Sequence, residues 1–237
     1  MTDEPTEEDV DAVRPPSSDL SGPTTGWFQR ARTIEAAAIA GVAYSLLTVV
    51  ALIGLSRFPD IDLGQEGLTA WYDDDANQGW LIASLSLASI GSIAFLWFVA
   101  VIRRRLGDLE DRFFATVFLS SGIVYVAVWL IGAGALAAPA VAMTQLDAAT
   151  VTPASASLAG GIGGSMILVV APRLQAVFIF STSTVILRSR VLPSWLAIVG
   201  YISGIVLFVV PLVAQPVGLM FPAWVFIVSV VLMLHRP

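Results

Sequence analysis

Six apolar segments occupy most of this chain of 237 residues and limit what it can fold into. A helix that crosses a bilayer needs about 20 mainly apolar residues, and each segment is close to or above that length. The sequence therefore predicts an all-α polytopic bundle of about six transmembrane helices in one domain, residues 34–237. The predicted crossings are approximately residues 34–58, 80–102, 113–138, 162–187, 194–213 and 218–234.

Composition supports a membrane protein and argues against nucleic acid as a partner. Hydrophobic residues make up 57% of the chain and charged residues 13%, whereas an ordinary soluble domain carries about 25% charge. Such a chain has too little polar surface to coat a water-soluble globule. The net charge is -6, and no basic face is available to neutralise phosphates.

Arginine positions predict the orientation, because Lys and Arg in short loops favour the cytoplasmic side. With the N-terminus inside, ten of the 12 basic residues are cytoplasmic. A count of five or seven helices would place one of the arginine clusters on the opposite side of the membrane. We therefore predict a multi-pass protein of the bacterial inner membrane with both termini in the cytoplasm. The ten are Arg14, Arg30, Arg32, Arg103, Arg104, Arg105, Arg112, Arg188, Arg190 and Arg236.

Two segments outside the predicted crossings have weaker patterns. Residues 1–33 combine acids with Pro, Ser, Thr and Gly and have few large apolar side chains, which predicts a disordered acidic cytoplasmic tail. This tail is either a solubilising extension or a segment for partner docking or phosphorylation. Residues 144–165 are compatible with an outer loop, a helix extension or a re-entrant segment.

The side chains that most membrane enzymes and cofactor proteins need are missing. The only histidine is His235 and there is no cysteine, so bis-His haem, His metal clusters and thiolate sites are excluded. No acid lies in the middle of a predicted crossing, since Glu35 is at the start of the first. The sequence predicts no cofactor, no metal and no catalytic residue.

Arg173 is the clearest polar exception within a crossing, because a charge there costs at least about 2.5 kcal/mol to insert. Pro172 cannot donate to the carbonyl of Leu168, which leaves that oxygen near the guanidinium. Gln175 follows two residues later. We predict an anion or lipid-headgroup site that includes Arg173 and Gln175, an ion pair between Arg173 and an acid of residues 59–78, or an Arg173 side chain that snorkels outward to the headgroups.

A run of three acids, Asp73, Asp74 and Asp75, is the second candidate site. Successive carboxylates can hold Ca²⁺ or another hard cation, although this spacing is not that of an EF-hand loop. The flanking aromatic residues are typical of membrane-interface anchors. The acidic cluster is therefore a solvated outer loop, a partner for Arg57 or Arg173, or a cation site.

Small and hydroxyl-bearing residues mark two further features of the crossings. Gly160 and Gly164, and Gly200 and Gly204, each form a GxxxG pair, which favours close helix packing within the chain or against a second copy or another membrane protein. The hydroxyls of residues 181–184 either line a polar path or bond back to their own helix.

The stretch LRSRVLPSWLAIVGYISGIVLFVVP resembles the C-terminal part of a family of uncharacterised bacterial, often actinobacterial, membrane proteins of unknown function. That family carries an RSxxLPxWLxxxG pattern after the fourth of about six helices. The resemblance implies a multi-pass membrane fold and brings no catalytic residues. The matching positions are Arg188, Ser189, Leu192, Pro193, Trp195, Leu196 and Gly200.

Two functions are consistent with these observations. The first is a non-enzymatic inner-membrane protein that acts through contacts with lipids or partners, as an accessory of the cell envelope. The second is a small transporter or permease-like protein with an outward-facing polar cavity near Arg173. A transporter needs a polar cavity that reaches the middle of the membrane, whereas a packing protein should have apolar side chains filling its centre.

Overall fold

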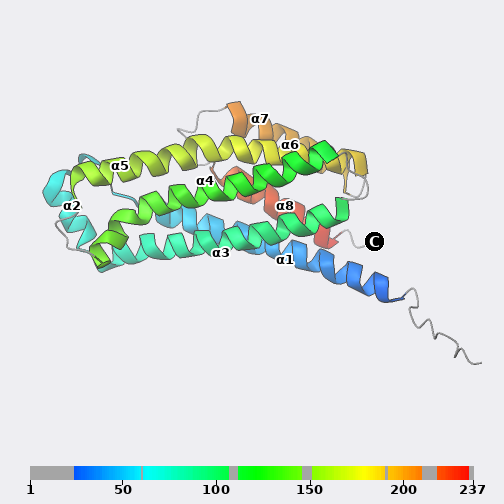
Figure 1. Ribbon diagram of the computed structural model, residues 1–237, viewed down its shortest axis with the longest axis horizontal. Helices are drawn as coiled ribbons and strands as arrows, with labels where there is room; N and C mark the ends of the chain where they lie inside the picture. The colour runs from blue at the N-terminus through cyan, green and yellow to red at the C-terminus, as the bar shows by residue number, and fades with distance from the viewer. Residues whose placement is uncertain are drawn as a thin grey trace, which may run out of the picture.

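The computed structural model is helical across the part of the chain that it describes, and it contains no strand there (Figure 1). The prediction of an all-α helical bundle is therefore confirmed. The described residues are 24–59, 61–106, 112–145, 151–189, 192–209 and 218–234.

The bundle is built from long helices joined by short connections. The residues of α5, η3 and α6 follow one another without a break as a single helix over residues 153–189, with η3 as a π-helical segment inside it. The elements in chain order are α1 (Thr24–Leu55), η1 (Ile61–Leu63), α2 (Gly64–Tyr72), α3 (Asp75–Leu106), α4 (Arg112–Gln145), α5 (Pro153–Gly164), η3 (Ser165–Val170), α6 (Ala171–Ser189), α7 (Ser194–Val209) and α8 (Met220–Leu234).

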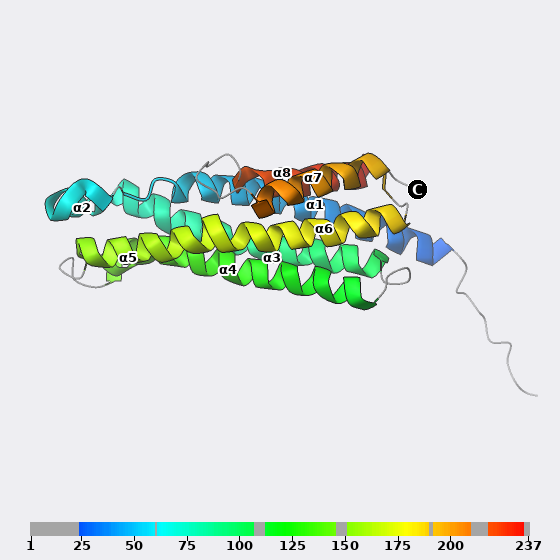
Figure 2. The ribbon, with the colours of Figure 1, turned by 90° about the horizontal axis from the view of Figure 1, so that it is seen from above.

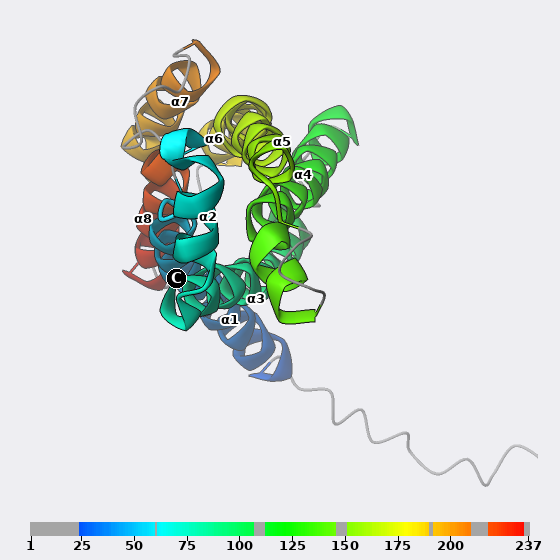
Figure 3. The same cartoon turned by 90° about the vertical axis from the view of Figure 1, so that its left-hand side faces the viewer.

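The helices form a ring around a common centre when the molecule is viewed along its long axis (Figure 3). α1 packs against α3 and α8, α4 packs against α3 and α6, and α7 packs against α6. The short helices α7 and α8 lie in the half of the bundle that contains the start of α1, and α2 and α5 lie at the other end (Figures 1 and 2).

Four of these helices are long and apolar enough to cross a membrane, and α7 and α8 are shorter apolar helices. Large apolar side chains point outward from several helices: Trp97 in α3 is 69% exposed and Ile198 in α7 is 57% exposed. In water such a surface would drive aggregation, whereas in a bilayer it faces lipid. The chain is therefore an integral membrane protein.

Several helices extend further than hydropathy predicted. α1 begins at Thr24, ten residues before the predicted start, so the prediction of a disordered tail over residues 1–33 is wrong for residues 24–33. Residues 1–23 lie outside the described part of the chain. α3 and α4 also extend beyond the predicted crossings, to Asp75 and Gln145. Hydropathy marks the part of a helix that contacts lipid, while an existing helix adds further turns at little cost.

The question left open for residues 144–165 has a partial answer. α5 begins at Pro153 and continues into the fourth crossing, so its residues extend that helix. A capping box between Thr152 and Ser155 satisfies amide groups at its start, and proline suits the first helical position. Residues 146–150 lie outside the described part.

The loop between the first two predicted crossings contains a short helix instead of remaining irregular. α2 buries Leu68 and Tyr72 against the bundle and leaves its acidic side exposed. The side-chain amide of Gln65 donates to the carbonyl of Val151 at 3.4 Å, which connects α2 to the segment before α5. α2 therefore covers the end of the bundle opposite to the start of α1.

Candidate functional site

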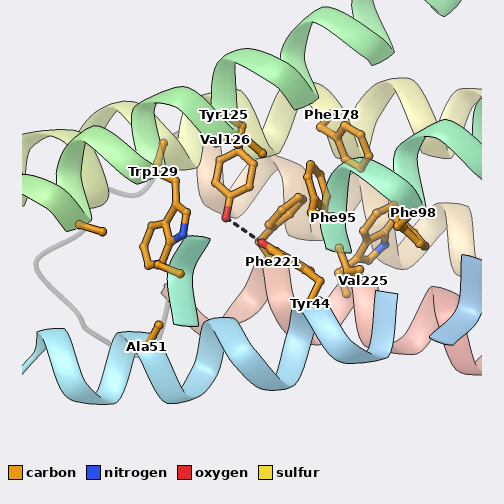
Figure 4. Close-up of a cluster of buried hydrophobic side chains, with 14 of the residues drawn as sticks. Tyr44, Ala51, Phe95, Phe98, Tyr125, Val126, Trp129, Phe178, Phe221 and Val225 are labelled. Atoms are coloured by element: carbon orange, nitrogen blue, oxygen red, sulfur yellow. Dashed lines mark hydrogen bonds between the residues drawn. The ribbon is translucent and has the colours of Figure 1, made fainter. Parts of the chain in front are cut away.

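Two tyrosines meet in the centre of the bundle, although their helices are not neighbours in the ring. The hydroxyls of Tyr44 in α1 and Tyr125 in α4 are 2.7 Å apart and share a hydrogen bond (Figure 4). Both side chains are buried. Because α3 lies between α1 and α4 in the ring, this bond connects two helices across the centre.

Phenylalanine rings from three other helices surround the tyrosine pair. The ring of Phe95 lies 4.8 Å from that of Tyr44 and 5.5 Å from that of Tyr125. The ring of Phe221 lies 5.0 Å from that of Tyr125, and the ring of Phe178 lies 5.2 Å from that of Phe95. We call these five residues the central aromatic cluster. Edge-to-face and tilted contacts of this kind are favourable, and here they fill the centre.

Small residues on α1 let neighbouring helices approach closely enough for this packing. A Cβ atom on Gly41 would lie 2.0 Å from the Oγ of Ser229 and 2.8 Å from the ring of Phe98. A Cβ atom on Gly54 would lie 1.8 Å from the Oγ of Ser84. Only glycine fits at these two crossings with α8 and α3. The close approach places long side chains elsewhere on the same helices within reach of the centre.

Polar atoms without partners lie next to the tyrosine pair. The Thr48 hydroxyl is buried within hydrogen-bonding reach of the Tyr44 hydroxyl, while the side-chain oxygen of Gln175 and the indole nitrogen of Trp129 are buried and have no hydrogen-bond partner within the described residues. The three residues are 1%, 6% and 2% exposed respectively. Each such group costs about 1–3 kcal/mol, and native proteins rarely leave buried polar groups unpaired.

These three side chains and the tyrosines belong to one cluster. Thr48 lies beside Tyr44, one turn further along α1, and Trp129 lies one turn beyond Tyr125 in α4. The side chain of Gln175 in α6 lies beside Tyr125. We call Tyr44, Thr48, Tyr125, Trp129 and Gln175 the central polar cluster. It contains no charged group.

A second, smaller set of unpartnered atoms lies where α6, α7 and α8 meet. The Oγ of Ser183 and the indole nitrogen of Trp224 are buried without a partner among the described residues. A Cβ atom on Gly200 would lie 2.1 Å from the first and 3.1 Å from the second. Glycine therefore permits α7 to pack directly over both groups.

Arg173 interacts with its own helix. Its guanidinium donates to the carbonyl oxygen of Val169, one turn earlier, and among the described residues no acid pairs with it. The sequence had placed the carbonyl of Leu168 near this guanidinium. Pro172 cannot donate a backbone hydrogen bond, and the preceding π-helical turn changes which carbonyls are available. Asp60, one of the acids of residues 59–78, lies outside the described part.

The structure does not bring Arg173 and Gln175 together as a site. Gln175 is buried and lies beside Tyr125, whereas Arg173 is half-buried and bonded to its own backbone. Two residues along a helix rotate the side chain by about 200°, so the two point to different sides. Gln175 belongs to the central polar cluster, and Arg173 does not.

The acids Asp73, Asp74 and Asp75 are exposed at the end of the molecule covered by α2. One carboxylate oxygen of Asp74 accepts a hydrogen bond from the amide of Ala76 at 2.9 Å, which caps the start of α3. Within the described residues, no group of three or more His, Asp or Glu side chains is arranged to hold a metal ion. These contacts give the acids a role in ending the loop and starting the helix.

Two aromatic residues near the acids have defined surroundings. The guanidinium of Arg57 lies 4.4 Å from the ring centroid of Trp80, in a cation–π contact. The Tyr72 hydroxyl is buried without a partner among the described residues, and burial raises the pKa of Tyr72 from 10.0 to about 12. The cation–π contact links the segment after α1 to α3, and the buried Tyr72 side chain packs α2 against the bundle.

The hydroxyls of residues 181–184 mostly bond to their own helix, as one of the two predictions stated. Ser181 donates to the carbonyl of Val177, and Thr182 donates to that of Phe178. Thr184 bonds to its helix and to the Tyr201 hydroxyl in α7 at 2.8 Å. They do not form a continuous polar path.

The GxxxG glycines pack within the chain, but not all at the predicted positions. Cβ atoms on Gly200 and Gly204 would collide with side chains of α6, so this pair packs as the motif predicts. On α5, Gly160 and Gly163 face neighbours, whereas a Cβ on Gly164 would meet nothing within 4 Å. The contact face of α5 is therefore shifted by one residue from the motif.

Sequence reasoning did not single out Tyr44, Tyr125, Thr48 or Trp129. The available signal was weak, because a tyrosine or threonine within an apolar run looks like any other tolerated residue. A search against protein-family models, curated proteins and solved structures found no match to this chain.

Proposed function

We propose that the chain is a six-crossing protein of the bacterial inner membrane with both termini in the cytoplasm. The four long apolar helices, together with the shorter α7 and α8, support this count. The distribution of arginines supports the orientation. The RSxxLPxWLxxxG stretch is consistent with the family that it resembles, since Leu196 and Gly200 are buried and Trp195 faces outward.

We further propose that the protein acts without catalysis, through contacts with lipids and with other membrane proteins. The observation that carries this proposal is the central aromatic cluster, whose rings pack against one another and fill the centre. Contacts with a second copy or a partner belong to the same proposal. A Cβ atom on Gly161 or Gly164 would meet nothing within 4 Å, so a helix of another chain can approach α5 there.

A transporter with an outward cavity at Arg173 is the second candidate. Its support is the charge within a crossing and the proline and π-helical turn beside it, since π-helical turns are frequent at functional sites. The hydrogen bond from Arg173 to its own helix argues against the transporter, because this bond already occupies one of the guanidinium donors that a substrate would need.

The orientation is tested with single cysteines, for which the cysteine-free chain is well suited. Asp74 and Arg103 are exposed near opposite ends of α3. A membrane-impermeant maleimide should label Asp74→Cys in intact cells, and it should label Arg103→Cys only after permeabilisation. The reverse pattern would overturn the proposed orientation, and labelling of both positions in intact cells would overturn the proposed spanning of α3.

The function is tested by reconstitution into liposomes. Vesicles with the protein should release or take up small ions, sugars and amino acids no faster than empty vesicles, and Arg173→Gln should change only stability or membrane insertion. Saturable uptake that Arg173→Gln abolishes would replace the first proposal with the transporter. Lys at position 173 is the matched control, because Arg173→Lys keeps the charge while losing the fork of donors.

A further inference from the structure

Arginines gather at one end of the bundle, on the ends of neighbouring helices. The last turn of α3 contains Arg103, Arg104 and Arg105, and α4 begins at Arg112. α4 packs between α3 and α6, and Arg188 lies in the last turn of α6. All these helix ends lie at the end of the molecule where α1 starts (Figures 1 and 2). We call this the arginine end.

The arginine end has an excess of positive charge. Two more arginines, Arg30 and Arg32, lie near the start of α1. The acids close to these arginines in the sequence are fewer, namely Glu35 in α1 and the three acids of residues 107–111, which lie outside the described part. A concentration of one sign of charge attracts groups of the opposite sign, so this end favours an anionic partner.

An apolar stripe on α3 leads up to the arginine end. Ile90, Ile93 and Trp97 are 55%, 56% and 69% exposed. Steps of three and four residues place them on one side of the helix, and Arg104 follows Trp97 by two turns on that same side. The stripe rises about 10 Å from Ile90 to Trp97, and Arg104 lies about 10 Å beyond it. One side of α3 therefore changes from exposed apolar residues to an arginine.

These two features together fit a phospholipid with an anionic headgroup. Guanidinium groups form paired hydrogen bonds with phosphate. Clusters of arginine beside a membrane helix attract an anionic lipid more strongly than a zwitterionic one. Exposed isoleucine and tryptophan side chains below the headgroup pack against acyl chains. A free phosphate ion would contact the arginines alone, whereas a phospholipid uses both features.

We infer that the end of α3, with the adjoining start of α4, binds an anionic phospholipid such as phosphatidylglycerol. The headgroup phosphate lies at Arg103, Arg104 and Arg112, and one acyl chain lies along Ile93 and Trp97. Arg103 is exposed, so a headgroup reaches it without rearrangement of the helices. The inference rests on the proposed contacts with lipids and names the class of lipid. In the proposed orientation this lipid belongs to the cytoplasmic leaflet.

Thermal titrations in detergent test the class of lipid. Phosphatidylglycerol should raise the unfolding midpoint more than phosphatidylcholine with the same acyl chains, because a ligand that binds only the folded state stabilises it. The double variant Arg103→Gln/Arg104→Gln should bind phosphatidylglycerol roughly 30-fold more weakly. Arg57→Gln is the matched control, since Arg57 is an exposed arginine near the opposite end of α3. This control should keep the full preference for phosphatidylglycerol.

Three results would overturn the inference. The first is equal midpoints with the two lipids, and the second is an equal loss of the preference in Arg57→Gln. The third is a rise with inorganic phosphate as large as that with phosphatidylglycerol, because the apolar stripe would then have no part in binding.

A salt titration of the unaltered protein decides if the double variant does not fold. Sodium chloride should remove the preference for phosphatidylglycerol, since salt screens exposed charges. A preference that persists in high salt would refute the role of the arginines. Solute uptake by liposomes would overturn the proposed absence of transport and would leave this lipid preference unchanged, so the two failures are distinguishable.

Discussion

Adjacent glycines in α5 should respond in opposite ways to the same substitution. A Cβ atom on Gly163 would lie 2.6 Å from the Cγ of Leu136 and 2.9 Å from the carbonyl oxygen of Gly132 in α4. A Cβ atom on Gly164 would have nothing within 4 Å. The backbone carbonyl cannot rotate away as a flexible side chain can, so Gly163→Ala must push α5 and α4 apart.

The magnitude follows from two opposing terms. Replacing glycine by alanine inside a helix gains up to about 1 kcal/mol of stability, and this gain is common to both positions. Overpacking at a close contact costs about 1–3 kcal/mol, and this cost applies to Gly163→Ala alone. The two variants should therefore differ by about 1–3 kcal/mol, with Gly164→Ala neutral or slightly stabilising.

Thermal unfolding in detergent measures this difference. For a chain of this size, each kcal/mol shifts the midpoint by roughly 2–4 °C, so Gly163→Ala should unfold roughly 2–12 °C below Gly164→Ala. Equal midpoints would refute the crossing between α5 and α4. A lower midpoint for Gly164→Ala would restore the GxxxG motif as the true contact face and show that α5 is rotated.

Three further perturbations test other contacts. Tyr44→Phe and Tyr125→Phe should each destabilise the protein by about 0.6–1.7 kcal/mol, and the double variant should lose little more, which denaturant titrations can measure. Trp80→Ala should lose about 0.5–1 kcal/mol because the cation–π contact with Arg57 is removed, and Trp80→Phe should retain part of it. Since the pKa of Tyr72 rises from 10.0 to about 12 on folding, its stabilising contribution is complete below pH 10 and should disappear as the pH approaches 12. Comparing midpoints of the unaltered protein and Tyr72→Phe across this range isolates that effect.

The sequence predicted the fold because membrane helices follow from long apolar runs, which need no knowledge of distant contacts. The third and fourth predicted crossings correspond to α4 and to α5, η3 and α6. The helix ends were predicted less well. Residues 24–33 and 139–145 can continue a helix as readily as they can form a loop, and hydropathy does not distinguish these outcomes.

The central polar cluster could not be predicted because its members lie far apart in the chain. Tyr44 and Tyr125 are 81 positions apart, and their contact depends on how α1 and α4 rotate in the ring. Sequence alone ranked Arg173 first because a charge is conspicuous. A tyrosine is inconspicuous in an apolar run, although its hydroxyl can form a hydrogen bond between helices in the centre of the bundle.

The two kinds of polar residue in the crossings are satisfied in different ways, and this difference indicates where function should be sought. The N–H groups of the Arg173 guanidinium need acceptors in an apolar setting, and one of them donates to the carbonyl of Val169. This carbonyl lies in the segment where Pro172 and the π-helical turn disturb the regular backbone hydrogen bonds. Part of its hydrogen-bonding capacity is thus satisfied within one helix. The side-chain oxygen of Gln175 and the indole nitrogen of Trp129 have no such local solution among the described residues. The tyrosine pair and the unpartnered atoms beside it therefore make the centre of the bundle a more informative place for substitutions than the conspicuous arginine.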